Sequence, residues 1–258
     1  MRERPILEHL RAINACNQRG GRMLSLIDLL EAESVDLPLA AYLAAMMRAG
    51  HSLLVGAQPG GAGKTTVMCA LLNFVPDETT LQAVENLHVL SQARRSPVGR
   101  TCYVAHEISP ATYYYAYLWG EAARRFFSLA SQGYMIASNL HADTLSETHE
   151  QLLGENAVRA EDLNAVSLKI YLDVRRRGGW SMQRWIRAVY EHDGRADRLI
   201  WQGEAPGRFV RRGESHCIAR AEEERYAELL NRLQREGVRR IEDVRRWLVG
   251  ASPARADS

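Results

Sequence analysis

One short run in the first quarter of the chain has the residue types of a phosphate-binding loop. It reads Gln58, Pro59, Gly60, Gly61, Ala62, Gly63, Lys64, Thr65 and Thr66. Glycines let backbone N–H groups turn towards an anion, and a helix that begins at such a loop directs the positive end of its dipole to the same place. Lys64 can reach the outer phosphates of a nucleotide, and the Thr65 hydroxyl can hold Mg²⁺. The run therefore predicts a site for ATP and Mg²⁺.

The residues around this loop favour the same interpretation. An apolar run, Leu53–Val55, precedes it and an apolar stretch over 67–72 follows it, so a strand, a loop and a helix come in the order that the motif needs. The sequence holds only two lysines, Lys64 and Lys169, and it keeps one of them where a compact charge is wanted. The usual first glycine of the motif is Gln58 here, so Pro59 to Gly61 must supply the turn.

Hydrolysis of a nucleotide also needs acidic groups at the ends of neighbouring strands. Glu121 ends the apolar run Tyr115–Trp119 and is a candidate ligand of the metal or of its water. Glu85 ends another expected strand and is a candidate base for the attacking water. His141 follows the expected strand Met135–Ser138 and could contact a terminal phosphate. Each of these three residues, taken alone, could equally be an ordinary solvated side chain.

The composition is that of an ordinary folded protein. The 258 residues are 46% apolar and 25% charged with a formal net charge of +2, so nothing global demands nucleic acid or an anionic membrane. The four cysteines lack CxxC spacing, which fits reduced thiols. No run approaches the length of a membrane span, and Met1–Pro5 does not begin a signal peptide. We expect a cytoplasmic protein that reaches a membrane only through a partner.

The hydrophobic pattern predicts four regions along the chain. Residues 1–50 form a short lead-in with two helices, and 51–167 alternate strands with helices, which implies a largely parallel sheet covered on both faces. Residues 168–250 add a hairpin, a further strand and two amphipathic helices, and 251–258 read as a disordered tail. The expected helices and strands in the first three regions are Leu26–Glu33, Leu37–Arg48, Leu81–Val84, Cys102–Ala105, Tyr115–Trp119, Glu121–Ser131, Met135–Ser138, Leu168–Val174, Trp185–Glu191, Leu199–Trp201, Arg220–Glu236 and Ile241–Leu248.

The order of these blocks resembles that of the secretion-system and type IV pilus ATPase superfamily, in particular its archaeal and tight-adherence-like branch. Val84-Glu85-Asn86 resembles the Asp box of that family, and Trp119-Gly120-Glu121 resembles its Walker B motif. Asn139 to Thr144 resembles its His box. The segment Ser25–Leu43 looks like the family's lead-in to the phosphate-binding loop. The resemblance spans about residues 17–248.

The resemblance implies a RecA-like P-loop core, an ATP-driven and typically hexameric ring, and a polytopic membrane platform protein as partner. Members power pilus assembly, secretion or filament rotation. Carried over to this chain, Lys64 and Thr65 are the phosphate and Mg²⁺ residues, Glu85 is the Asp-box acid, Glu121 is the Walker B acid and metal residue, and His141 is the His-box histidine. The family's transition-state arginines fall between the Asp box and Walker B, where this chain has Arg94, Arg95 and Arg100.

Several positions depart from the family pattern and keep a second interpretation open. Gln58 replaces a glycine, Asn86 replaces an aspartate, and Tyr134 replaces the first histidine of the His box. A nucleotide-binding assembly or regulatory protein with little or no hydrolysis would tolerate these changes. A small-molecule P-loop kinase is a third interpretation, but the arginine-rich stretch 94–100 is its only lid-like material. No motif predicts specific binding of nucleic acid.

Overall fold

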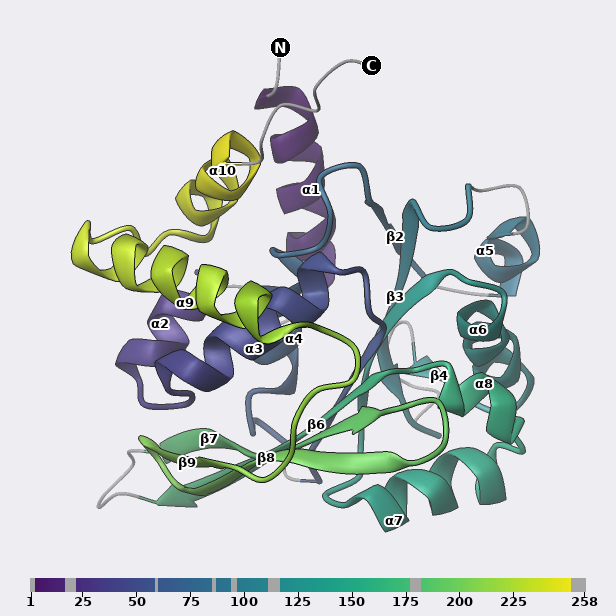
Figure 1. Ribbon diagram of the computed structural model, residues 1–258. Helices are drawn as coiled ribbons and strands as arrows, with labels where there is room; N and C mark the ends of the chain where they lie inside the picture. Colours follow the sequence, from purple (N-terminus) through teal and green to yellow (C-terminus); the bar gives the residue numbers. More distant parts are fainter. Residues whose placement is uncertain are drawn as a thin grey trace.

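The computed structural model describes residues 3–16, 22–58, 60–84, 87–93, 97–110, 117–176 and 182–251. In these ranges a sheet runs through the molecule with helices on both faces (Figure 1). The strands are β1 (Leu53–Gly56), β2 (Thr80–Ala83), β3 (Thr101–Ile108), β4 (Tyr117–Leu118), β5 (Met135–Leu140), β6 (Leu168–Arg176), β7 (Met182–His192), β8 (Asp197–Ala205) and β9 (Arg208–Arg211). The helices are α1 (Glu3–Cys16), α2 (Leu26–Glu31), α3 (Leu37–Arg48), α4 (Lys64–Leu72), α5 (Leu87–Gln92), α6 (Glu121–Ser131), α7 (Leu145–His149), its π-helical continuation η2 (Glu150–Glu155), α8 (Ala160–Asn164), α9 (Arg220–Arg235) and α10 (Ile241–Ala251).

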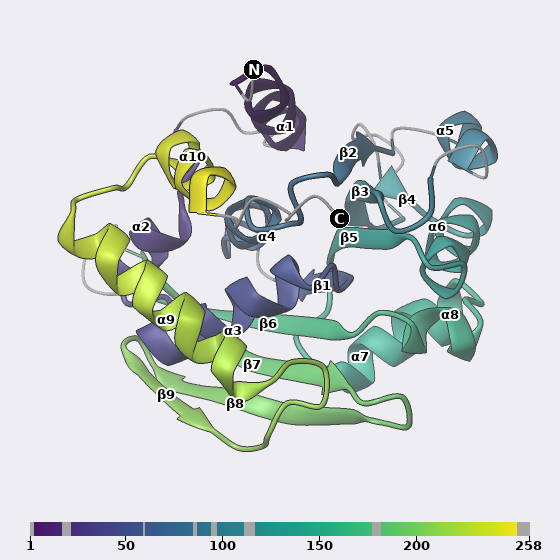
Figure 2. The same cartoon turned by 45° about the horizontal axis from the view of Figure 1, so that its top comes forward.

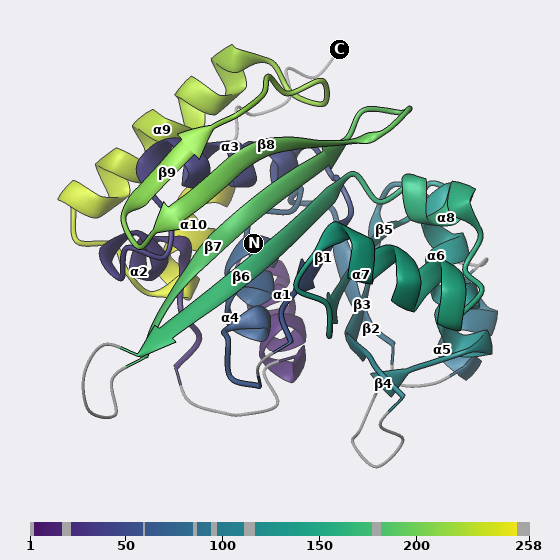
Figure 3. The ribbon, with the colours of Figure 1, turned by 90° about the horizontal axis from the view of Figure 1, so that it is seen from below.

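The strand order explains how distant segments meet. It is β2-β3-β5-β1-β6-β7-β8-β9, with β4 paired to β3. Every pair from β2 to β6 is parallel. The pairs from β6 to β9 are antiparallel, and Figure 3 shows these four strands from below. The predicted α/β fold, with a largely parallel sheet and an antiparallel C-terminal run, is confirmed. The strand that enters the loop, β1, lies between β5 and β6.

Helices cover the two faces of the sheet in two groups. One face carries α1, α2, α3, α4, α9 and α10, and the other carries α5, α6 and α8 (Figures 1 and 2). Alternation along β1 serves both layers, because Leu53 and Val55 join the first core and Leu54 joins the second. Such two-sided burial is the reason that the parallel strands read as continuous apolar runs.

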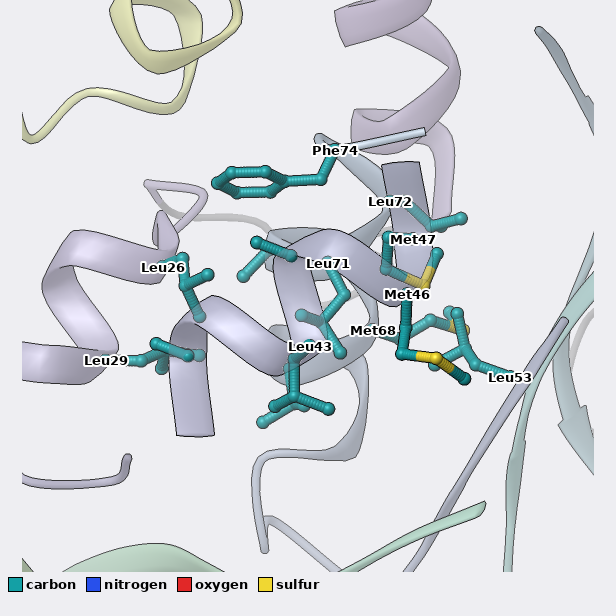
Figure 4. Packing of buried hydrophobic residues seen from close by; sticks show 14 of the residues in the cluster. Leu26, Leu29, Leu43, Met46, Met47, Leu53, Met68, Leu71, Leu72 and Phe74 are labelled. Atoms are coloured by element: carbon teal, nitrogen blue, oxygen red, sulfur yellow. The ribbon is translucent and has the colours of Figure 1, made fainter. Parts of the chain in front are cut away.

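The core of the first layer forms where α3 crosses α4 above β1. Leu43, Met46, Met68 and Leu71 are fully buried there, and Leu53 of β1 lies beneath them (Figure 4). Full burial of side chains of this size stabilises the fold by about 1.5–3 kcal/mol each. This packing fixes α4, and therefore the loop that precedes it, against the sheet.

Two helix starts follow from their capping residues. The Ser25 side chain accepts a hydrogen bond from the Asp28 N–H, and the Asp28 carboxylate accepts one from the Ser25 N–H. Asp36 caps α3 through the Leu39 N–H, with Pro38 in the first turn. The predicted bounds of α3 and α6 agree with the structure.

The N-terminal region holds one helix that the sequence analysis does not predict. Helix α1 has buried apolar residues at helical spacing, Ile6, Leu10 and Ile13, and it lies against α4 and α10. The sheet does not break at residue 168, where the sequence predicts the start of a C-terminal region, because β1 and β6 pair directly.

Among the described helices, none has both the length and the apolar character that crossing a bilayer requires.

Candidate functional site

The loop between β1 and α4 has the backbone shape expected of a phosphate-binding loop. Gly61 and Gly63 adopt positive φ angles of 82° and 97°, which side-chain-bearing residues rarely adopt. Gly63 precedes the first residue of α4, and no side chain caps that helix. The first-turn N–H groups and the helix dipole are therefore directed to the loop. Pro59 lies outside the described residues.

Gln58 does not have a positive φ angle, so the replacement of glycine by glutamine does not strain the loop backbone. Instead, it fastens the loop to the segment after β5. Its N–H donates to the Asp143 carboxylate over 2.7 Å, and its side-chain amide donates to Glu147 over 2.9 Å. Its carbonyl oxygen lies 3.2 Å from Nδ1 of His141. The residue that replaces the usual glycine thus connects the loop with the predicted His box.

Close backbone approach explains the glycine that ends β1. A Cβ added to Gly56 would lie 2.4 Å from the carbonyl oxygen of Ala142 and 2.8 Å from the Tyr171 ring. Ala57 N–H also donates to the Leu140 carbonyl. The backbone of the segment that carries His141 therefore packs closely against the start of the loop.

Lys64 and Thr65 open α4 and lie at the loop as predicted. The buried Lys64 donates from Nζ to the Ala57 carbonyl over 2.7 Å, so its ammonium group stays beside the loop backbone. The Thr65 hydroxyl accepts a hydrogen bond from the Asn139 side chain over 3.3 Å. Asn139 is fully buried on β5 and also donates to the His106 carbonyl of β3 over 2.7 Å. It joins the loop helix to two neighbouring strands.

Glu107, at the carboxyl end of β3, is an acid that the structure brings close to Lys64. Its side chain is buried and forms an ion pair with Nε2 of His141. Burial alone would raise the pKa of this carboxyl, but the hydrogen bond from His141 and the positive charge of Lys64 outweigh burial and lower the pKa below its usual value. Glu107 is therefore held as a carboxylate within the electrostatic reach of Lys64.

His141 connects these groups. Its Nδ1 faces the Gln58 carbonyl and its Nε2 faces the Glu107 carboxylate. The predicted position of His141 beside the loop is thus found in the structure, and its ligand remains a prediction.

Glu121 lies further out. It is the first residue of α6, its side chain is about half exposed, and it pairs with Arg125 of the same helix at 2.5 Å. Strand β4 pairs with β3 in parallel, so Glu121 leaves the same edge of the sheet as the loop. However, β4 is three strand spacings from β1, or roughly 14 Å, whereas β3 is two spacings away. In the described residues no hydrogen bond or ion pair joins Glu121 to Lys64 or Thr65, and its predicted role stays a prediction.

Other predicted positions have different outcomes. Glu85, Asn86, Arg94 and Arg95 lie outside the described residues, so the Asp-box role of Glu85 stays a prediction. Tyr134 is buried, and its hydroxyl donates to the Ala93 carbonyl over 3.1 Å.

The site also contains residues that the sequence analysis did not identify. Glu107 carries the same signal as Glu85 and Glu121, a carboxylate after an apolar strand, but the expected strand ends at Ala105, whereas β3 continues to Ile108. Asn139 is the first residue of the segment that resembles the His box, but the sequence alone assigns no role to it. Arg184 and Arg187 of β7, which donate to the carbonyls of Gly61 and Asp143, lie in no motif of the sequence.

Among known proteins, only solved structures are similar to this chain. No family model and no curated protein matches it. Its fold is similar to the VirB11 ATPase of the Brucella suis type IV secretion system, solved with sulphate, with 19% identity and a TM-score of 0.46 over 64% of this chain and 54% of that one. It is also similar to the ATPase DotB of Yersinia pseudotuberculosis, with 11% identity and a TM-score of 0.43 over 76% and 53% of the two chains. For the DotB ATPase of Legionella pneumophila, the values are 10% and 0.41 over 84% and 59%.

These similarities are to secretion ATPases, the class that the motifs resemble, at low sequence identity. The chain spans between 53% and 59% of the length of these three proteins.

Proposed function

We propose that this chain binds ATP with Mg²⁺ at the loop 58–66 and hydrolyses it. The observation that carries this proposal is the convergence of Lys64 and Thr65, at the start of α4, with the buried carboxylate of Glu107. A lysine and backbone amides suit a triphosphate, and hydroxyl and carboxylate oxygens suit a hard divalent cation and its water.

Each residue of the site has a task in this reaction. The amides of the loop and Lys64 bind the β- and γ-phosphates. Thr65 would hold Mg²⁺, and the bound ion would neutralise part of the phosphate charge. Glu107 orients the attacking water and accepts its proton, because its lowered pKa keeps it ionised. Asn139 holds the Thr65 hydroxyl in place. His141, between the loop and Glu107, transmits loss of the γ-phosphate to the segment after β5.

At the level of the assembly, we propose a motor subunit of the secretion and pilus type. It would work in a ring of six copies in the cytoplasm, at the inner face of a membrane through a polytopic platform protein. The motif order and the arrangement of the site support this reading. Mass photometry with and without ATP and Mg²⁺ tests the ring. A particle of six chains is expected, and a monomer under both conditions would contradict the motor.

Calorimetric titration of ATP with Mg²⁺, together with steady-state phosphate release, tests the site. The wild-type chain is expected to bind ATP and release phosphate, and Lys64→Ala is expected to lose both. Arg212→Ala is the control, because this arginine pairs with Glu204 on β8, away from the loop. If Lys64→Ala binds and turns over ATP like the wild type, the proposed site is wrong.

A second function has one observation in its favour. The Glu107 carboxylate already has an ion-pair partner, His141, which would compete with an attacking water for it. A regulatory or assembly protein that binds ATP without hydrolysing it would have such a site. Tight ATP binding, with phosphate release no faster than that of Glu107→Gln, would identify this second function.

A further inference from the structure

The β6–β7 ribbon extends beyond the strand that enters the loop. β1 ends at Gly56, which lies opposite Tyr171 in the middle of β6, whereas β6 continues to Arg176. This five-residue continuation has a length of roughly 17 Å. The ribbon therefore projects from the sheet edge on the side where the loop leaves β1.

Arg184 of this ribbon lies on the loop. Its Nε donates to the Gly61 carbonyl over 2.7 Å, and its Cδ lies 3.4 Å from the place where a side chain at Gly63 would begin. Its position on the strand explains this contact. Arg184 shares a face with Ile186, which belongs to the same core as α4, because residues two apart on a strand point to the same side.

The backbone of Arg184 is fixed by the turn between α2 and α3. The hydroxyl of the buried Ser34 donates to the Arg184 carbonyl over 2.7 Å, and the Ile186 N–H donates to the Ser34 carbonyl over 3.0 Å. Arg184 is thus held through its backbone by Ser34 and through its side chain by Gly61, although that side chain is exposed.

The guanidinium group has donors to spare. Only Nε and, over 3.3 Å, Nη1 have hydrogen-bond acceptors among the described residues, and both acceptors are carbonyls, of Gly61 and Met182. No carboxylate of the described residues forms an ion pair with Arg184. An arginine fork matches two oxygens of a phosphate, and the nucleotide proposed above would bring its phosphate chain to this loop.

We propose that Arg184 binds the terminal phosphate of the nucleoside triphosphate from within the same chain. This inference rests on the proposed nucleotide site. It assigns to the C-terminal ribbon a positive charge at the γ-phosphate, so that the ribbon distinguishes the triphosphate from the diphosphate. The Gly61 carbonyl holds Nε, and the remaining N–H groups take the phosphate oxygens.

Calorimetric titrations of ATP and of ADP, both with Mg²⁺, test this role. Arg184→Ala is expected to weaken ATP binding about tenfold or more and ADP binding much less, because the lost hydrogen bonds are made to a charged group of the triphosphate alone. Arg184→Lys is expected to restore only part of the ATP affinity, since it keeps the charge without the fork.

Arg175→Ala is the matched control. Arg175 stands on the same ribbon, but on the opposite face, where its guanidinium stacks on Trp185 at 5.6 Å. This variant is expected to keep both affinities, and thermal unfolding reports whether each variant is folded.

The outcomes separate this inference from the proposed function. ATP binding by Arg184→Ala at the wild-type affinity would overturn the role of Arg184 alone. Equal losses for ATP and ADP would overturn its selectivity for the terminal phosphate. A wild-type chain that binds neither nucleotide would overturn the nucleotide site together with it.

Discussion

The imidazole of His141 and the carboxylate of Glu107 form an ion pair across β5 and β3, directly beside the loop that begins α4. Each member of the pair also interacts with the loop. His141 contacts the Gln58 carbonyl, and the positive charge of Lys64 helps to lower the pKa of Glu107. A conformational change of the loop can therefore alter the environment of Glu107, the candidate base, through the side chain of His141 alone.

Removal of this ion pair is predicted to change the pH dependence of ATP turnover. In His141→Asn the Glu107 carboxyl keeps its burial but loses a hydrogen bond and a positive charge, so its pKa rises. The acid limb of the profile of kcat against pH is expected to move to higher pH. His149→Asn is the control, because His149 has almost the same exposure, 43% against 42%, and contacts Asp197. An acid limb that stays in place would contradict the assigned role of the pair.

The same pair makes a prediction for stability. Because the folded-state pKa of Glu107 is lowered, its contribution stabilises the protein above the usual carboxyl pKa of 4.5 and is lost as the pH falls through the lowered value. The free energy of unfolding, measured with urea, is therefore expected to fall more between pH 7 and pH 3 for the wild type than for Glu107→Gln. Equal losses would contradict the ionised, paired state of Glu107.

Gly56→Ala is predicted to damage the site through the backbone. The new methyl group would meet the Ala142 carbonyl oxygen at 2.4 Å, and overpacking of this kind costs about 1–3 kcal/mol. Urea denaturation measures the loss, and ATP titration measures the displacement of the neighbouring His141. Gly154→Ala has open space around the new Cβ and is expected to be neutral or stabilising by up to about 1 kcal/mol. Similar stabilities for the two variants would show that the close approach at Gly56 does not matter.

Arg245 is predicted to hold α10 against the end of α4. Its buried guanidinium donates from Nη1 to the carbonyls of Asn73 and Val75, over 2.9 and 2.7 Å. Arg245→Met would remove the side-chain donor of the Asn73 carbonyl and leave the Val75 carbonyl with Arg48 alone, over 3.2 Å, and it is expected to lower the free energy of unfolding by about 2–4 kcal/mol. Arg246→Ala removes an exposed ion pair with Asp243 and is expected to cost less than about 1 kcal/mol. Urea unfolding compares the two, and a smaller effect at Arg245 would contradict this role.

Much of the fold could be predicted from local patterns. Capping residues and apolar spacing gave the bounds of α3, and alternation of strands and helices predicted the parallel sheet. Helix α1 was missed because its charged and polar residues hide a short apolar stripe, Ile6, Leu10 and Ile13, that becomes visible only once α4 is there to cover it.

The candidate site could be predicted only where one motif carries it. Lys64, Thr65 and His141 follow from short runs of sequence. Glu107 does not, since the strand that brings a carboxylate close to Lys64 depends on strand order, and the neighbours of β1 in the sheet are β5 and β6, neither of which is the next strand in the chain. Arg184 depends on the register of an antiparallel pair, which no local pattern fixes.

Phosphate release by Glu107→Gln and Glu121→Gln, each compared with wild type at saturating ATP and Mg²⁺, tests the central claim most directly. Loss of a general base typically lowers kcat by a factor of about 10²–10⁴, and that loss is expected for Glu107→Gln while its ATP affinity is kept. Glu121→Gln is expected to stay close to wild type, since its carboxylate pairs with Arg125 at the surface. Unchanged turnover in Glu107→Gln, with turnover lost in Glu121→Gln, would contradict the account and return the acid to the position that the motif resemblance implies.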